Sequence, residues 1–194
     1  MKQYIFFITL IITTSLFAQN TTFDKYNWNT IPEEAKSDTV QSVNGVKVTF
    51  ERRIKEVYLN SESYFEEINV FHRKIKLETH SAIDISNKIY IPVNDVIKIL
   101  NIKARFISST GKITELTQES IKELDNLDNK GDFKIFAIEG IEIGGEIEYF
   151  YTLRSKFNTS QAVWMQGEEP RTNVEVFFIF PSNIGERYRL IDNR

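Results

Sequence analysis

Histidine and acidic side chains are the residues of this chain that could perform catalysis or bind a metal. The two histidines, His72 and His80, are eight residues apart, so only the fold could bring them together. Neither belongs to a His-Glu-x-x-His arrangement, which binds zinc from one helical face. We therefore expect His72 to be a structural or surface residue, and we predict no metal site.

Acidic residues fall in two places where they could act in pairs. Glu142, Glu146 and Glu148 lie on a predicted hairpin, and Glu168 and Glu169 lie in a predicted loop. Two carboxylates about 5–10 Å apart across a cleft could hydrolyse a glycosidic bond. With 27 acidic residues in the chain, however, some pair is close by chance. We therefore expect these acidic side chains to lie on a solvated strand face. A hydrolase that uses a carboxylate pair is our third hypothesis, after the two given at the end of this section.

Other catalytic patterns fail on residue type. The chain has no cysteine, which excludes thiolate nucleophiles, cysteine-based metal sites and iron–sulfur clusters. It has no Gly-x-Ser-x-Gly motif, and Gly144-Gly145 lacks the Lys-Ser/Thr and the helix of a phosphate loop, so it predicts a tight turn. Residues 125–132 fail as a calcium loop, because Lys130 takes a ligand position and Ala137 replaces the closing glutamate. We predict no catalytic residue, no metal and no cofactor.

Composition indicates a globular, strand-rich domain. Of the 194 residues, 41% are hydrophobic and 13% aromatic, and phenylalanine and tyrosine suit half-buried pleated surfaces. The net charge is −3, with basic and acidic residues interleaved, so no basic stripe for nucleic acid is present.

The N-terminus predicts export. Lys2 precedes an apolar run from Tyr4 to Phe17, and Ala18 offers a small residue at a cleavage position. The run is shorter than the roughly 20 residues that span a bilayer, which favours a signal peptide over residues 1–18 rather than an uncleaved anchor. No cysteine follows it to carry a lipid. We expect a periplasmic or extracellular protein that meets the membrane only through its signal peptide during export.

After a polar lead-in over residues 19–45, the two-residue hydrophobic period of strands dominates. We expect the lead-in to pack loosely around Tyr26 and Trp28, with a helical turn at 31–35. Val46, Val48 and Phe50 alternate with polar residues, which predicts a strand with one buried face and a bulge between residues 54 and 57. A turn at 60–63 and a second strand to about residue 79 complete a hairpin. Further strands are predicted over residues 88–91, 99–107, 113–116, 133–137, 145–156 and 174–180 and near 188–191.

Two segments depart from the simple strand pattern. Thr117 to Leu127 is predicted as a helix, because Ile121, Leu124 and Leu127 have helical spacing after a Thr117 N-cap. Residues 174–180 are apolar on both faces, which is typical of a central strand or of one covered by a partner.

Two glycine-marked hairpin patterns carry a family resemblance. The first runs from Ile102 through the Ser109-Thr110-Gly111 turn to Leu116, and the second from Ile138 through Gly144 to Tyr151. Together with residues 164–170 and the strand ending at 180–181, they resemble a bacterial domain of unknown function that precedes transglutaminase-like domains in exported proteins. The likeness extends loosely over residues 40–190.

The resemblance implies a fold more than an activity. In that family the catalytic cysteine, histidine and aspartate belong to the following domain, so no catalytic residue carries over to this chain. Relatives often have Pro-Asp-Gly where this chain has Ser109-Thr110-Gly111, a departure within ordinary turn chemistry.

We predict an all-β fold, an antiparallel β-sandwich of about eight to ten strands over residues 46–194 with one short helix. The leading hypothesis is an exported, non-catalytic accessory or binding module, whose partner would be a transglutaminase-like domain or a cell-surface polymer. Trp164, Met165 and Phe157 could line a carbohydrate platform, although an exported sandwich usually buries such residues. The alternative is the N-terminal portion of a longer transglutaminase-like protein (a peptidase or acyl-transfer enzyme) whose catalytic domain lies downstream.

Overall fold

The computed structural model describes residues 21–28, 41–116, 121–124, 131–159, 163, 165 and 167–182. The predicted signal peptide, the helical turn at 31–35 and the strand near 188–191 lie outside these residues. The described part is an all-β fold with one short helix. Its elements are β1 (Val46–Leu59), β2 (Phe65–Leu77), α1 (His80–Ser86), β3 (Lys88–Pro92), β4 (Val96–Ile107), β5 (Ile113–Glu115), β6 (Ile121–Leu124), β7 (Phe133–Ala137), β8 (Glu146–Lys156) and β9 (Val174–Ile179).

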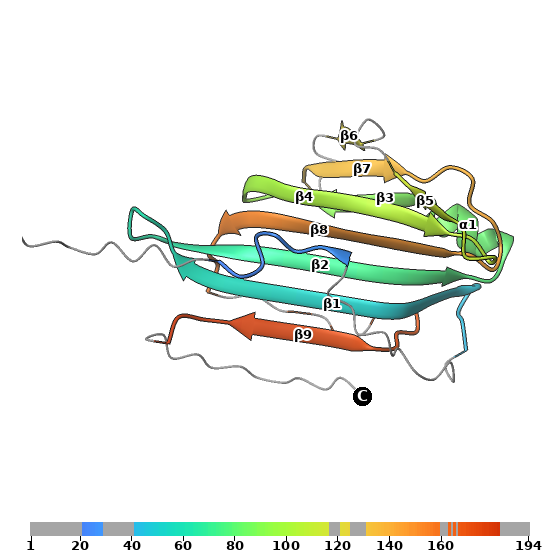
Figure 1. The fold of residues 1–194 in the computed structure, drawn as a ribbon, viewed down its shortest axis with the longest axis horizontal. Helices are drawn as coiled ribbons and strands as arrows, with labels where there is room; N and C mark the ends of the chain where they lie inside the picture. Colours follow the sequence, from blue (N-terminus) through green and yellow to red (C-terminus); the bar gives the residue numbers. More distant parts are fainter. Residues whose placement is uncertain are drawn as a thin grey trace, which may run out of the picture.

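The strands form two sheets in a sandwich-like arrangement. The large sheet has the order β5-β4-β8-β2-β1-β9, and the small sheet has the order β3-β7-β6 (Figure 1). Among the described strands, every pair is antiparallel except β1 with β9, which run parallel. The predicted hairpin is confirmed, because β1 and β2 pair along their length around a turn at residues 60–64.

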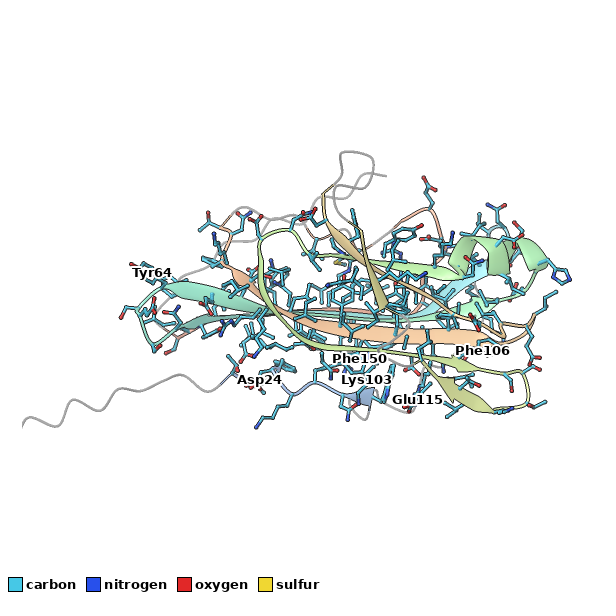
Figure 2. The ribbon with its side chains drawn as sticks, turned by 90° about the horizontal axis from the view of Figure 1, so that it is seen from above. Asp24, Tyr64, Lys103, Phe106, Glu115 and Phe150 are labelled. Atoms are coloured by element: carbon cyan, nitrogen blue, oxygen red, sulfur yellow. The ribbon has the colours of Figure 1, made fainter. Side chains whose placement is uncertain are left out.

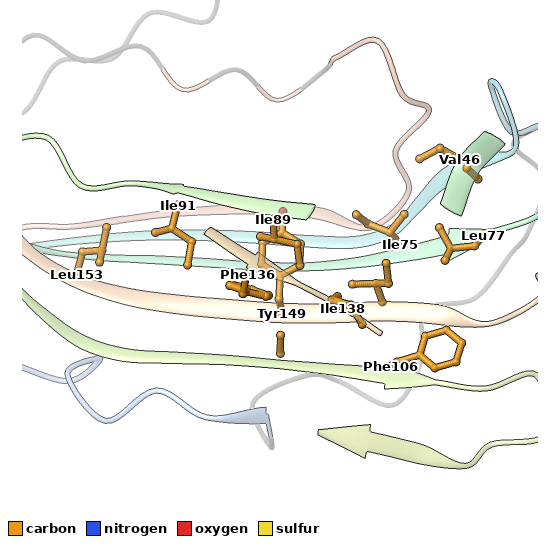
Figure 3. Packing of buried hydrophobic residues seen from close by; sticks show 13 residues of the cluster. Val46, Ile75, Leu77, Ile89, Ile91, Phe106, Phe136, Ile138, Tyr149 and Leu153 are labelled. Atoms are coloured by element: carbon orange, nitrogen blue, oxygen red, sulfur yellow. The ribbon is translucent and has the colours of Figure 1, made fainter. Parts of the chain in front are cut away.

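The main hydrophobic core lies between the two sheets, on what we call the inner face of the large sheet. Ile75 and Tyr149 from the large sheet pack in one cluster with Ile89 and Phe136 from the small one (Figure 3). Aromatic and β-branched side chains pack well on such pleated surfaces. This core holds the small sheet and α1 against the large sheet.

The opposite, outer face of the large sheet is covered by residues 21–28, here called the N-terminal segment. Figure 2 shows this segment, near the Asp24 label, on the other side of the large sheet from α1. Tyr26 is only 3% exposed and packs in a second apolar cluster with Ile54, Val70 and Phe150. The expectation of loose packing is therefore wrong for these residues, because the apolar side chains of the outer face bury Tyr26.

Several local predictions are corrected. The helix predicted over 117–127 is wrong at its centre, where Ile121–Leu124 form β6 and pair with β7; the remaining residues of that range lie outside the described part. The short helix is instead α1, whose N-cap Thr79 accepts a hydrogen bond from the Ala82 backbone N–H. The bulge in β1 lies between Val48 and Phe50 rather than at 54–57.

Strand β9 pairs with β1 at one edge of the large sheet, so the central position predicted for it is wrong. The other predicted position, a strand covered by a partner, stays a prediction. Phe177 and Phe178 remain 45% and 43% exposed.

Candidate functional site: an open groove beside buried ion clusters

The central strands of the large sheet bury ionisable side chains on both faces. Glu51, His72 and Glu148 are each at most 1% exposed. A buried charge is costly unless it is paired and hydrogen-bonded, so each of these groups needs partners. Two clusters provide them, one on each face.

The histidine cluster (Tyr26, His72, Arg105 and Glu148) lies on the outer face. The Tyr26 hydroxyl is 2.7 Å from His72 Nδ1, and His72 Nε2 is 3.1 Å from Glu148 Oε1. Arg105 Nε donates to Glu148 Oε2 at 2.6 Å. Pairing across the β2–β8 and β4–β8 ladders brings these residues together from distant parts of the sequence.

The charge states in this cluster follow from burial and hydrogen bonding. Burial opposes ionisation of Glu148, but the hydrogen bonds from His72 and Arg105 outweigh it and lower the carboxyl pKa. Burial lowers the pKa of His72, although Glu148 acts in the opposite direction. The imidazole is therefore neutral near pH 7. Because the carboxylate only accepts, Nε2 carries the proton and Nδ1 accepts from the Tyr26 hydroxyl.

This cluster anchors the N-terminal segment. Trp28 lies over the Arg105 guanidinium, with 4.4 Å between ring centroid and Cζ. At the other end of the segment, the Thr22 and Phe23 backbone N–H groups donate to the Glu56 carboxylate at 2.8–3.0 Å. A His–Glu pair could act as a base, but His72 is 0% exposed beneath this segment. His72 was expected to be a structural or a surface residue, and its burial confirms that it is a structural one.

The arginine cluster (Glu51, Arg53, Arg73 and Arg171) lies on the inner face, toward β9. Glu51 Oε1 accepts from Arg53 and Arg171 at 2.7 and 3.1 Å, and its Oε2 accepts from Arg73 at 2.8 Å. Glu169 lies 3.6 Å from Arg171 as a second acidic partner. Three guanidiniums thus share one fully buried carboxylate.

A shallow groove of about 200 Å³ opens beside the arginine cluster, over β1, β2, β8 and β9. The lining side chains used below are Arg53, Lys55, Phe71, Val163, Val176 and Phe178. Arg53 is the most exposed of the three arginines, at 27% of its side chain against 14% and 10% for Arg73 and Arg171. The groove therefore combines an accessible guanidinium, an ammonium group and apolar walls.

The other residues with possible chemistry are dispersed. His80 is exposed at the start of α1, away from the buried His72. Glu146 pairs with Lys74 at 2.8 Å, and Glu142 and Glu168 are exposed. The solvated strand face predicted for the hairpin acids is wrong for Glu148. Within the described ranges, no group of three or more histidine, aspartate or glutamate side chains is placed to hold a metal.

The proposed carbohydrate platform is not assembled in the described part. Met165 is 47% exposed, and Phe157 packs edge-on against Phe65 with centroids 6.0 Å apart. Trp164 lies outside the described residues. Among the residues described, no helix has the length and apolar character needed to cross a membrane.

The two glycine-marked segments that carry the family resemblance meet at one end of the large sheet. The first forms the β4–β5 hairpin, but the hairpin predicted for the second is wrong, because residues 138–145 connect β7 of the small sheet to β8 of the large sheet. Ser109 lies 3.4 Å from the Glu142 carboxylate through both its backbone nitrogen and its hydroxyl. Gly144 has a φ of 83°, and the Gly145 backbone N–H donates to Glu142 O at 3.2 Å, which confirms the tight turn. A Cβ on Gly145 would lie 2.3 Å from the Phe106 ring, so the strand must pass that ring without a side chain. Both motifs therefore have structural roles in one corner of the fold.

Comparison with known proteins identifies no family. No family model matches the chain, and no curated protein matches it. Among solved structures, a crystal structure of a putative protease from Parabacteroides distasonis ATCC 8503 is similar, with 16% identity and a TM-score of 0.47. The match covers 62% of this chain and 25% of that protein.

Proposed function

We propose that the protein is an exported, non-catalytic binding module. The observation that carries this proposal is where the reactive side chains lie. His72, Glu148 and Glu51 are closed inside ion clusters, whereas the groove beside Arg53 is open to solvent. A general acid or base must reach the substrate within hydrogen-bond distance, which these buried groups do not. A binding site needs only an accessible concave surface with a few polar groups.

The test is a binding screen run together with a turnover screen. The purified protein is heated with cell-surface glycans and peptides, and a ligand is expected to raise the midpoint of unfolding because it binds only the folded state. The same compounds are then checked for hydrolysis. Hydrolysis that one point mutation in this chain abolishes would overturn the proposal.

A second candidate function rests on the family resemblance. We propose as the alternative that the chain is the front portion of a transglutaminase-like protein. Its support is the resemblance of the two glycine-marked segments to that family, and these segments lie together in the fold, with Ser109 and Glu142 in contact. Extending the coding sequence beyond Arg194 tests it: a downstream cysteine, histidine and aspartate set is expected, and an immediate stop codon would contradict it.

A further inference from the structure

The charge around the groove is opposite in sign to that of the whole chain. The ion pairs in and beneath the groove connect four basic side chains with three acidic ones, which leaves one positive charge. These residues are Arg53, Lys55, Arg73, Arg171, Glu51, Glu67 and Glu169. The full chain carries a net charge of −3. A local positive surplus on an acidic protein favours an anionic ligand at this place.

Arg53 and Lys55 are the groups that can meet such a ligand. Both line the groove, and each is paired with a buried carboxylate that also accepts from other side chains. Glu51 divides its two oxygens among three arginines, and Lys55 Nζ is 3.3 Å from Glu67. A guanidinium binds a carboxylate through two parallel hydrogen bonds, and a nearby ammonium adds a third donor.

The walls of the groove indicate what accompanies the anion. Val163, Val176 and Phe178 supply apolar surface beside the two cations. Ligand pockets usually enclose about 300–1,000 Å³, so an open groove of about 200 Å³ suits one or two side chains rather than a whole small molecule. A carboxylate next to a short apolar side chain fits this combination.

The aromatic rings of the groove floor favour a peptide over a sugar. Phe71 stacks on Tyr151 with centroids 5.3 Å apart and 20° between the ring planes. Arg53 and Arg73 lie over the Phe71 ring at 5.1 and 5.6 Å. These ring faces are already occupied, so they are not available for stacking on a carbohydrate ring.

We propose that the groove binds an acidic peptide segment, with a carboxylate on Arg53 and Lys55 and a neighbouring apolar side chain against Val176 and Phe178. This inference rests on the proposed binding function and adds the class of its ligand. Because the carboxylate contact is charge-assisted, affinity should fall as salt rises.

Fluorescence anisotropy with labelled peptides tests the assignment. The probe is a short peptide of alternating valine and glutamate, and its matched control replaces glutamate with glutamine. We expect the acidic peptide to bind at least about tenfold more tightly, the difference of roughly one charge-assisted contact. Arg53→Gln and Lys55→Gln should each weaken it about tenfold, whereas Lys88→Gln, an exposed lysine on β3 outside the groove, should change it less than about twofold.

The Lys55→Gln variant and the ligand screen separate a failed peptide assignment from a failed binding function. Lys55→Gln leaves the Glu51 pairs intact, so a folded Lys55→Gln protein keeps the test valid if Arg53→Gln is unstable. Equal affinity for the glutamine peptide, equal affinity of Lys55→Gln and Lys88→Gln, or tighter binding of a uronic-acid oligosaccharide would each overturn the peptide assignment. The binding function itself would then stand or fall on the ligand screen above.

Discussion

Removing the Tyr26 hydroxyl is the sharpest test of how the N-terminal segment is held. Tyr26→Phe keeps the ring, which packs edge-on against Phe150 with centroids 5.3 Å apart, and deletes the 2.7 Å contact with His72 Nδ1. Glu148 holds the imidazole proton on Nε2, so Nδ1 has no donor after the substitution. A buried polar atom left without a partner costs about 1–3 kcal/mol, and we expect that loss in the free energy of unfolding.

The assay is urea denaturation near pH 7.5 with linear extrapolation to water. Tyr64→Phe is the matched control, because Tyr64 is 66% exposed and its loss should cost less than about 0.5 kcal/mol. A Tyr26→Phe loss as small as that of the control would refute the reasoning. It would mean that the hydroxyl contributes nothing to anchoring the segment.

Three further predictions follow from the buried groups. Because burial lowers the folded-state pKa of His72, the unfolded chain binds more protons below about pH 6.5, so the free energy of unfolding should fall as pH drops from about 7 to 5. Denaturation curves recorded across this pH range should show a weaker pH dependence for His72→Gln than for the unchanged protein. Glu51→Gln leaves three arginines without their shared negative charge and should lower the free energy of unfolding by about 3–5 kcal/mol in urea denaturation. The exposed control Glu62→Gln should lower it by less than about 0.5 kcal/mol, and equal losses would refute the buried cluster. Gly145→Ala should cost about 1–3 kcal/mol and lower the calorimetric Tm, because its Cβ would lie 2.3 Å from the Phe106 ring; an unchanged Tm would contradict that contact.

Hydrophobic periodicity was sufficient to predict the long strands. The β1–β2 hairpin and the strand β8 follow from alternation and from turn residues, which act over short stretches of chain. The same local information misassigned Ile121–Leu124, whose spacing suits a helix but whose pairing with β7 decides the outcome. The helix α1 has only seven residues, too few for a helical period, although Thr79 is a recognisable N-cap.

The candidate site could not be predicted because it is built from long-range pairing. Arg171 meets Glu51 across 120 residues, and Tyr26 meets His72 across 46. The alternation of polar and apolar residues in β1 also suggested that its polar residues face water. This pattern does not show whether a strand is central in its sheet, so it could not predict that Glu51 is buried. The parallel placement of β9 against β1 brings Val176 and Phe178 beside Arg53, and no local pattern specifies it.

The most direct measurement of the central claim is the intact mass of a bound acidic peptide after prolonged incubation with the protein. The peptide should be retained at equilibrium, released by salt and recovered unchanged, because Arg53 and Lys55 hold it while the buried clusters cannot reach it. Recovery of cleaved or transferred peptide, lost in a single-residue variant of this chain, would contradict the account.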